Sequence, residues 1–213
     1  MIARSPRAAV VVAVLVSTAA AAEQRGAPPS QPPATAPAQP GQRGGGRGRG
    51  AVQVMTLTAS AWPDGGRIPP KHTQEGGEVS PALAWSNAPE GVVSYVLVVH
   101  DVDAAVGSGI DDILHWLVWN MPGASTSLPE GVPATPQLPD GTRQISATSP
   151  GYRGPGAPAS GPPHHYLFEL FALDTLVDVP AVGASPPQTR AAVTAAMAGH
   201  VRGKAVYVGL FRR

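Results

Sequence analysis

The chain has 213 residues and a formal net charge of +1 at pH 7, and it contains no cysteine. Disulfides, zinc–thiolate sites and a thiol nucleophile are therefore excluded. Six of the 15 basic residues precede residue 53, which leaves nine basic and thirteen acidic residues beyond it. This mildly acidic balance argues against a broad nucleic-acid-binding face, so any bound anion must be held by local donors.

Residues 1–22 have the pattern of a secretory signal peptide. Arg4 and Arg7 precede an apolar stretch over 8–15, and alanines occupy positions 20–22. An uncleaved membrane anchor is the alternative, although the apolar stretch is short for a membrane span. The sequence therefore predicts a periplasmic or secreted protein.

Residues 23–52 have the composition of a disordered linker. They are almost wholly Pro, Ala, Gln, Gly and Arg, and they include the run GQRGGGRGRG. Such a segment cannot bury enough apolar surface to offset the entropy of ordering. Its arginines resemble a nucleic-acid-binding RGG segment, but such segments are usually longer and an exported protein does not meet nucleic acid. We expect a solvated tether with at most peripheral membrane contact and no nucleic-acid partner.

Beyond residue 53 the pattern is mostly that of short strands. In the run SYVLVVHDVD, strict alternation puts two carboxylates on the same face as three large apolar side chains. That face consists of Tyr95, Leu97, Val99, Asp101 and Asp103. The nearly continuous apolar run over 205–211 predicts a central strand.

The same alternation sorts the histidines of two further strands. In HWLVWN it groups His115 with Leu117 and Trp119. In HHYLFELFALD it groups His164, rather than its neighbour, with Tyr166. The sequence therefore selects His164 as the companion of the tyrosine.

One helix is predicted near the end of the chain. Ser185 is a suitable N-cap, Pro186 and Pro187 suit a first turn, residues 189–197 are alanine-rich, and Gly199 ends the pattern. Elsewhere, proline and glycine separate short strands at close intervals. These features predict a mainly β fold, an antiparallel β-sandwich or a related architecture, in a single domain over 53–213.

Four side chains from different segments are candidates for a common site: Asp101, Asp103, His115 and His164. They could ligate a divalent metal, act as a general acid and base, or form a hydrogen-bonding rim for a polar headgroup. The plainer alternatives are a pair of exposed turn carboxylates and a histidine satisfied in the core. The acidic pair Asp111–Asp112 is interpreted as a solvated loop.

A loop with the sequence GYRGPGAPASGPP, from residue 151 to 163, has the character of a binding wall. Gly151, Gly154 and Gly156 permit close backbone approach, and the prolines stiffen the loop. Its backbone amides could bind oxyanions without a basic side chain. An ordinary surface loop is the alternative. No phosphate-binding P-loop and no G-x-S-x-G nucleophile motif is present.

Several of these runs, in order, resemble one family: SPALAWSNAPEGVVSYVLVVHDVDA, HWLVWNMP, LPEG, the GYRGP loop, HHYLFELFALD and GHVRGKAVYVGLF. The stretch from Gln53 to Arg213 is similar to the phosphatidylethanolamine-binding protein family, in its bacterial Raf-kinase-inhibitor-like (YbhB/YbcL-like) branch. The resemblance implies an antiparallel β-sandwich with one or two short peripheral helices. It also implies a small pocket for phosphate, phosphorylethanolamine or a similar anion.

The resemblance assigns ligand-binding positions residue by residue. The carboxylates of the family's D-P-D-A-P segment fall on Asp101 and Asp103, and further pocket positions fall on the H-W, G-P and H-x-Y motifs. Those further positions are His115, Gly154, Pro155, His164 and Tyr166. Trp85 and Trp119 resemble core or pocket-wall positions of the family, and core packing is the preferred role for both.

The chain departs from the family pattern at two places. Val102 and Ala105 replace the two prolines of D-P-D-A-P, and Ala157 interrupts the Pro-Pro that usually follows the G-P pair. Both changes predict a pocket of altered shape on an unaltered fold.

Three functions follow as hypotheses. The first is an exported protein that binds a small anion or a phospholipid headgroup. The second is a protein-interaction module that inhibits a protease or a kinase through the rim of the pocket. The third is a metal-assisted hydrolase. The first is preferred, so we expect no catalytic residues, no metal and no cofactor.

Overall fold

The computed structural model describes residues 51–213. The predicted signal peptide and nearly all of the predicted linker lie outside these residues. Among residues 51–213, no helix has the length and apolar character needed to cross a membrane.

A seven-stranded sheet forms the larger layer of the fold. Its order is β1 (Gln53–Val54), β10 (Val201–Phe211), β9 (His164–Leu173), β5 (Ser94–Val106), β6 (Asp111–Pro122) and β8 (Arg143–Ile145), with β3 (Gly66–Arg67) pairing separately with β10. The pairs formed by β5, β6, β8, β9 and β10 with one another are antiparallel, whereas β1 and β3 lie parallel to β10. The predicted central strand is confirmed, because β10 is paired along both of its sides.

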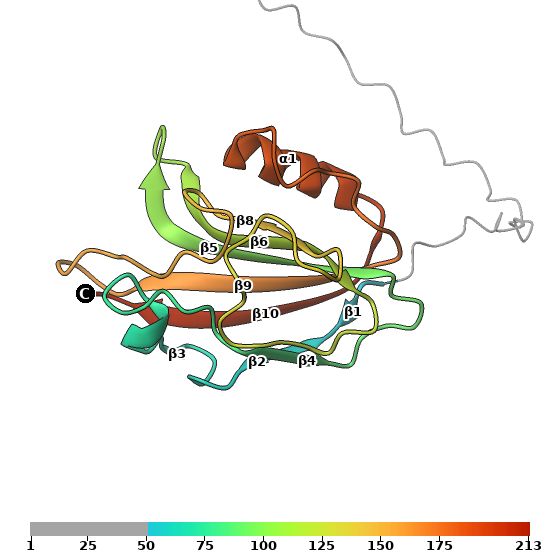
Figure 1. Ribbon diagram of the computed structural model, residues 1–213. Helices are drawn as coiled ribbons and strands as arrows, with labels where there is room; N and C mark the ends of the chain where they lie inside the picture. The colour runs from blue at the N-terminus through green and yellow to red at the C-terminus, as the bar shows by residue number, and fades with distance from the viewer. Residues whose placement is uncertain (1–50) are drawn as a thin grey trace, which may run out of the picture. The chain divides into compact units, whose positions relative to one another are not determined.

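A smaller antiparallel sheet forms the second layer. It consists of β2 (Thr56–Ala59), β4 (Leu83–Ser86) and β7 (Ser127–Leu128). In Figure 1, β2 and β4 lie below the larger sheet. The main hydrophobic core unites side chains of both sheets, including Leu57, Trp85, Phe168 and Tyr207. The predicted mainly β, antiparallel sandwich is therefore confirmed.

A single α-helix, α1 (Pro186–Met197), covers the other face of the larger sheet (Figure 1). It begins after Ser185, whose backbone N–H donates to Gln188 Oε1 at 3.1 Å, as in a capping box. Val193 and Met197 pack into a second core with β5 and β6. One short 3₁₀ turn, η1 (Pro70–His72), is the other helical element in the described part of the chain. Both agree with the one or two peripheral helices expected.

Alternation along β5 is confirmed. Tyr95, Leu97 and Val99 face the core between the sheets, whereas Val96 and Val98 face the core beneath α1. Successive side chains of β5 therefore alternate between the two cores. Asp101 continues the first of these two faces at the end of the strand.

The prediction that His115 shares a face with Leu117 and Trp119 is wrong, because β6 contains a β-bulge. Val99 pairs with Trp116 and His100 pairs with Leu114, so His115 is the extra residue between two registered pairs. The bulge turns its side chain away from the helix-side core that contains Leu117 and Trp119. It reaches the same side of the sheet as Tyr166 instead.

The interpretation of Asp111–Asp112 as a solvated loop is also wrong. Both residues belong to β6, and the Asp112 side chain is only 23% exposed. Asp112 accepts hydrogen bonds from His100 of β5 and Arg190 of α1. Asp112 therefore links α1 to the larger sheet through polar contacts.

Candidate functional site

A cavity of about 340 Å³ opens where β5, β6 and β9 meet the loop that follows β8. Among its lining residues are five of the predicted site residues: Asp101, Asp103, His115, His164 and Tyr166. Gly156, Ala157 and Pro158 of the glycine- and proline-rich loop line it as well. A cavity of this size lies at the lower end of the range found for small-molecule sites.

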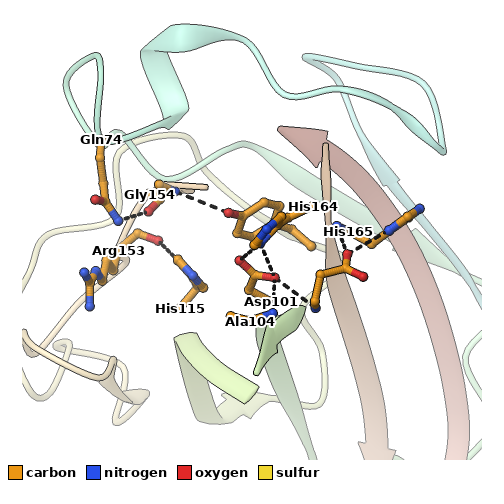
Figure 2. Close-up of polar contacts among 11 residues, drawn as sticks. Gln74, Asp101, Ala104, His115, Arg153, Gly154, His164 and His165 are labelled. Carbon is orange, nitrogen blue, oxygen red and sulfur yellow. Dashed lines mark hydrogen bonds and ion pairs between the residues drawn. The ribbon is translucent and has the colours of Figure 1, made fainter. Parts of the chain in front are cut away.

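Asp101 is the buried carboxylate of the site, with 3% of the residue exposed. Its Oδ1 accepts the backbone N–H groups of Asp103 and Ala104, both at 3.1 Å. Its Oδ2 lies 2.9 Å from His164 Nδ1 (Figure 2). The carboxylate thus orders the turn that the family's prolines would otherwise stiffen, while it orients one imidazole.

Asp103 is the exposed carboxylate, and its partner is the other histidine. Its Oδ2 accepts the backbone N–H of His165 at 2.6 Å and lies 2.8 Å from His165 Nδ1. The backbone hydrogen bond, followed by the imidazole contact, lowers the pKa of Asp103 below its usual value although desolvation opposes this. The two carboxylates therefore belong to separate pairs on one rim of the cavity, both ready to accept hydrogen bonds from a cation.

His115 is held in one orientation by the loop. Its Nδ1 lies 2.9 Å from the carbonyl oxygen of Arg153, so Nδ1 carries the proton and donates it. The ring meets Tyr166 edge-on, with the centroids 5.0 Å apart. Burial lowers the pKa of His115, although the Arg153 carbonyl and Asp101 act in the opposite direction. The imidazole is therefore neutral at pH 7, and its Nε2 is then an acceptor.

Tyr166 lines the cavity although it is fully buried, and its hydroxyl accepts the backbone N–H of Gly156 at 3.3 Å. Burial raises the pKa of Tyr166 well above its usual value, and the negative charge of Asp101 raises it further. The phenol therefore stays protonated over the whole physiological range.

Gly154 and Pro155 lie behind the lining and not among it. The Gly154 N–H donates to Glu78 Oε2 at 2.9 Å, and its carbonyl accepts from Gln74 Nε2 at 2.8 Å. A Cβ at Gly154 would lie 2.7 Å from the backbone carbonyl carbon of Thr73. The predicted close backbone approach is thus between the loop and the His72–Thr73 segment. The Gly154 amide is not available to a ligand, because it is hydrogen-bonded to Glu78.

Two polar residues of the cavity were missed by sequence reasoning: Gln74 and Arg153. Arg153 is the one basic residue in the GYRGPGAPASGPP loop, and that was a signal the sequence contained. Gln74 comes from a distant segment, just after η1, and no local pattern indicated it. Figure 2 shows His115 between Arg153 and Asp101.

A larger groove of about 780 Å³ lies between α1 and β6. Its walls are mostly apolar, and the charged pair within it, Asp112 and Arg190, is already joined by hydrogen bonds. The smaller cavity has fewer apolar walls and more convergent polar groups. It is therefore the better candidate for recognition of a small polar molecule.

The metal hypothesis lacks geometric support. Within residues 51–213, no three side chains of the histidine, cysteine, aspartate or glutamate type converge as ligands of one ion. Asp101 and Asp103 each bind a histidine of their own, which spreads the candidate ligands along the rim.

The comparisons with known proteins agree with the fold. The family model described as "Phosphatidylethanolamine-binding protein" matches residues 58–212. A UPF0098 protein of Methanothermobacter thermautotrophicus is 40% identical over 161 residues, which cover 75% of this chain and 99% of that relative. The UPF0098 protein YbhB of Escherichia coli is 36% identical over 128 residues, covering 56% of this chain and 78% of YbhB.

Two solved structures are similar at the level of the whole domain. The phosphatidylethanolamine-binding protein homologue CT736 of Chlamydia trachomatis has a TM-score of 0.62 and 28% identity, covering 76% of this chain and 99% of CT736. YbcL of Escherichia coli has a TM-score of 0.62 and 26% identity, covering 75% of this chain and 98% of YbcL.

Proposed function

The chain belongs to the phosphatidylethanolamine-binding protein family, and on that premise we propose that it is an exported protein that binds a small zwitterionic phosphoryl compound in the cavity beside Asp101. Phosphorylethanolamine, free or as a lipid headgroup, is the chemical type. The supporting observation is that two carboxylates, two histidines and a tyrosine together line one cavity of about 340 Å³.

The two carboxylates are the receptor for an ammonium group. The lowered pKa of Asp103 means that this carboxylate keeps its negative charge in mildly acidic solution. A bound phosphate alone would be repelled by such a rim. A zwitterion places its positive end there, and it is therefore preferred over a simple anion.

The phosphoryl group belongs at the His115 side of the cavity. Neutral His115 offers only the acceptor Nε2 to a ligand, because its proton lies on Nδ1. Protonation converts Nε2 into a charged donor, and charge-assisted hydrogen bonds are about twice as strong as neutral ones. Since burial lowers the pKa of His115, affinity for the phosphoryl group should rise as the pH falls below the ordinary histidine range.

Two observations support export: the sequence of residues 1–22, which lie outside the described residues, and the name of one relative. The sequence over 1–22 has the three regions of a signal peptide. A relative from Mycobacterium tuberculosis, LppC, carries a lipoprotein name and is 33% identical over 154 residues. Secretion of the full chain with removal of residues 1–22, read from the N-terminal sequence of the mature protein, is the expected result.

Calorimetric titration with phosphorylethanolamine, with inorganic phosphate in parallel, tests the binding proposal. We expect saturable binding that is tighter for the zwitterion and that strengthens between pH 8 and pH 5.5. The double variant His115→Ala, Asp101→Asn should lose roughly tenfold or more in affinity, because charge-assisted hydrogen bonds contribute about 1.5–3 kcal/mol.

The matched control is His200→Ala, because His200 is a solvent-exposed histidine paired with Asp174 far from the cavity lining. It should bind like the wild type. Absence of heat up to millimolar ligand with the wild-type protein would refute the proposal. Capture of a protein partner that survives in the His115→Ala, Asp101→Asn variant would then favour the interaction-module hypothesis.

A further inference from the structure

Arg153 is the only lysine or arginine among the described residues that line the cavity. It comes from the loop that follows β8, and both its N–H and its carbonyl group are held by His115 of β6. Its N–H donates to the carbonyl of His115 at 2.9 Å, and its own carbonyl accepts from His115 Nδ1 at 2.9 Å. The residue is half-buried. These two hydrogen bonds therefore fix the backbone of Arg153 beside His115.

The guanidinium of Arg153 forms no ion pair and no hydrogen bond with the rest of the described residues. The ion pairs among residues 51–213 do not include it. Its side chain also forms none of the hydrogen bonds found in that part of the chain, although its backbone forms two. Five N–H donors at the edge of a polar cavity are thus available to a ligand.

Two amides of the loop and the histidines of the cavity are not free to donate at neutral pH. The Gly154 amide binds Glu78, and the Gly156 amide binds the Tyr166 hydroxyl. His164 Nδ1 faces Asp101, and neutral His115 has no second proton. At neutral pH, an anion in this cavity would find Arg153 as its strongest donor.

The charges of the cavity are separated along one direction. In Figure 2 the carboxylate of Asp101 and the side chain of Arg153 lie on opposite sides of His115. Both charges act on that imidazole, since Asp101 raises the pKa of His115 and Arg153 lowers it, although burial is the larger influence. The cavity therefore has an acidic rim and a basic rim with the histidine between them.

We propose that Arg153 is the phosphoryl-binding and specificity-determining residue of this cavity, and that it orients a zwitterion with its phosphoryl group at Arg153 and its ammonium group at Asp101 and Asp103. This proposal rests on the proposed function and adds the polarity of the bound ligand. A guanidinium matches two phosphoryl oxygens at once, whereas a lysine ammonium acts as a point charge.

The test is a titration series on the full chain with Arg153→Gln and Arg153→Lys. The probes are phosphorylethanolamine, inorganic phosphate, glycerophosphorylethanolamine and ethanolamine. We expect Arg153→Gln to weaken all three phosphoryl probes by roughly 10- to 100-fold, since a hydrogen bond to a charged group contributes about 1.5–3 kcal/mol. Ethanolamine binding should not weaken, because it uses the acidic rim alone.

Arg153→Lys should lie between the wild type and Arg153→Gln for the phosphoryl probes. The control Arg212→Gln removes one positive charge from a residue whose side chain binds the Gly161 carbonyl and does not line the cavity. It should match the wild type. Arg153→Gln leaves both backbone hydrogen bonds in place, so its melting temperature should also be unchanged.

The comparison of phosphorylethanolamine with its glyceryl ester separates a free compound from a lipid headgroup as the preferred source. Unchanged phosphoryl affinity in Arg153→Gln, with affinity lost in the His115→Ala, Asp101→Asn variant, would overturn this proposal and leave the proposed function intact. Equal weakening of ethanolamine and phosphate would also overturn it, because it would indicate a general disturbance of the cavity. A wild-type protein that binds none of the probes would overturn both.

Discussion

At the scale of single residues, two glycines of one loop have different neighbours. An added Cβ at Gly154 would lie 2.8 Å from the carbonyl oxygen of His72 and equally close to backbone atoms of Thr73. An added Cβ at Gly156 would instead meet the end of the Gln74 side chain. Backbone atoms in a packed turn cannot withdraw, whereas a glutamine side chain can rotate. The two positions should therefore tolerate alanine unequally.

We expect Gly154→Ala to destabilise the protein by about 1–3 kcal/mol, as overpacking of a fixed site does. Gly156→Ala is the matched control and should cost clearly less. Urea denaturation of both variants measures the difference. Equal stability of the two variants would show that the loop shifts freely away from η1.

The histidines show how far sequence reasoning reaches at this scale. Alternation paired His164 with Tyr166 correctly, because β9 is regular from His164 to its end. It misplaced His115, because a bulge adds one residue to β6 and reverses the parity before it. No local pattern in HWLVWN marks that bulge, since the bulge depends on the register with β5. The family motif, in contrast, assigned His115 to the pocket.

At the scale of elements, a cluster of charged side chains joins α1 to four strands of the larger sheet. His100 of β5 lies between Asp112 of β6 and Glu169 of β9, and its Nε2 is 3.2 Å from Glu169 Oε2. Arg190 of α1 binds Asp112, and Lys204 of β10 binds Glu169 at 2.6 Å. Each nitrogen of the imidazole therefore faces a carboxylate.

Burial of His100 disfavours its charged form, but the neighbouring Glu169 and Asp112 outweigh burial and raise its pKa. The close contact with the His100 imidazole, 3.2 Å from Glu169 Oε2, is the largest cause that lowers the pKa of Glu169, to about 2. A raised histidine pKa stabilises the fold below pH 6.5, and this contribution is lost as the pH rises through the folded-state value. The lowered Glu169 pKa stabilises above about pH 4.5 and is lost toward pH 2.

The difference in stability between the wild type and His100→Gln should therefore depend on pH. We expect about 1.5–3 kcal/mol near pH 6, where the imidazolium is hydrogen-bonded to charged groups, and a smaller difference at pH 9. Thermal denaturation at both values measures it. His200→Gln removes an exposed ion pair and should change stability by less than about 1 kcal/mol. A difference for His100→Gln that is identical at the two pH values would contradict the charge assignment.

At the scale of the whole molecule, the architecture was predictable and the strand order was not. Alternation, turn residues and the capping pattern of α1 identified the elements that matter for the site. The pairing of β5 with β9, however, brings Ser94 beside Leu173, and nothing in either segment encodes a partner so far along the chain. The resemblance to a family predicted the sandwich but no strand order, and local propensity contains little non-local information.

The two cores share β5 and β6, so we expect the fragment 53–213 to unfold as one cooperative unit without the preceding residues. Trp116 reports on the core between the sheets and Trp119 on the core beneath α1. Far-ultraviolet circular dichroism and tryptophan fluorescence should give coincident thermal transitions, equal to those of the full chain. Separate transitions, or a lower melting temperature for the fragment, would show that residues before 53 contribute to folding.

The position of β10 affects the order in which the molecule can be completed during synthesis. This strand spans Val201–Phe211, yet it lies inside the sheet, between β9 on one side and the early strands β1 and β3 on the other. Tyr207 and Phe211 also complete the core between the sheets. Without these residues β9 would have an open edge and the early strands β1 and β3 would have no partner in the larger sheet, so we expect the sandwich to complete its folding only after β10 has been synthesised.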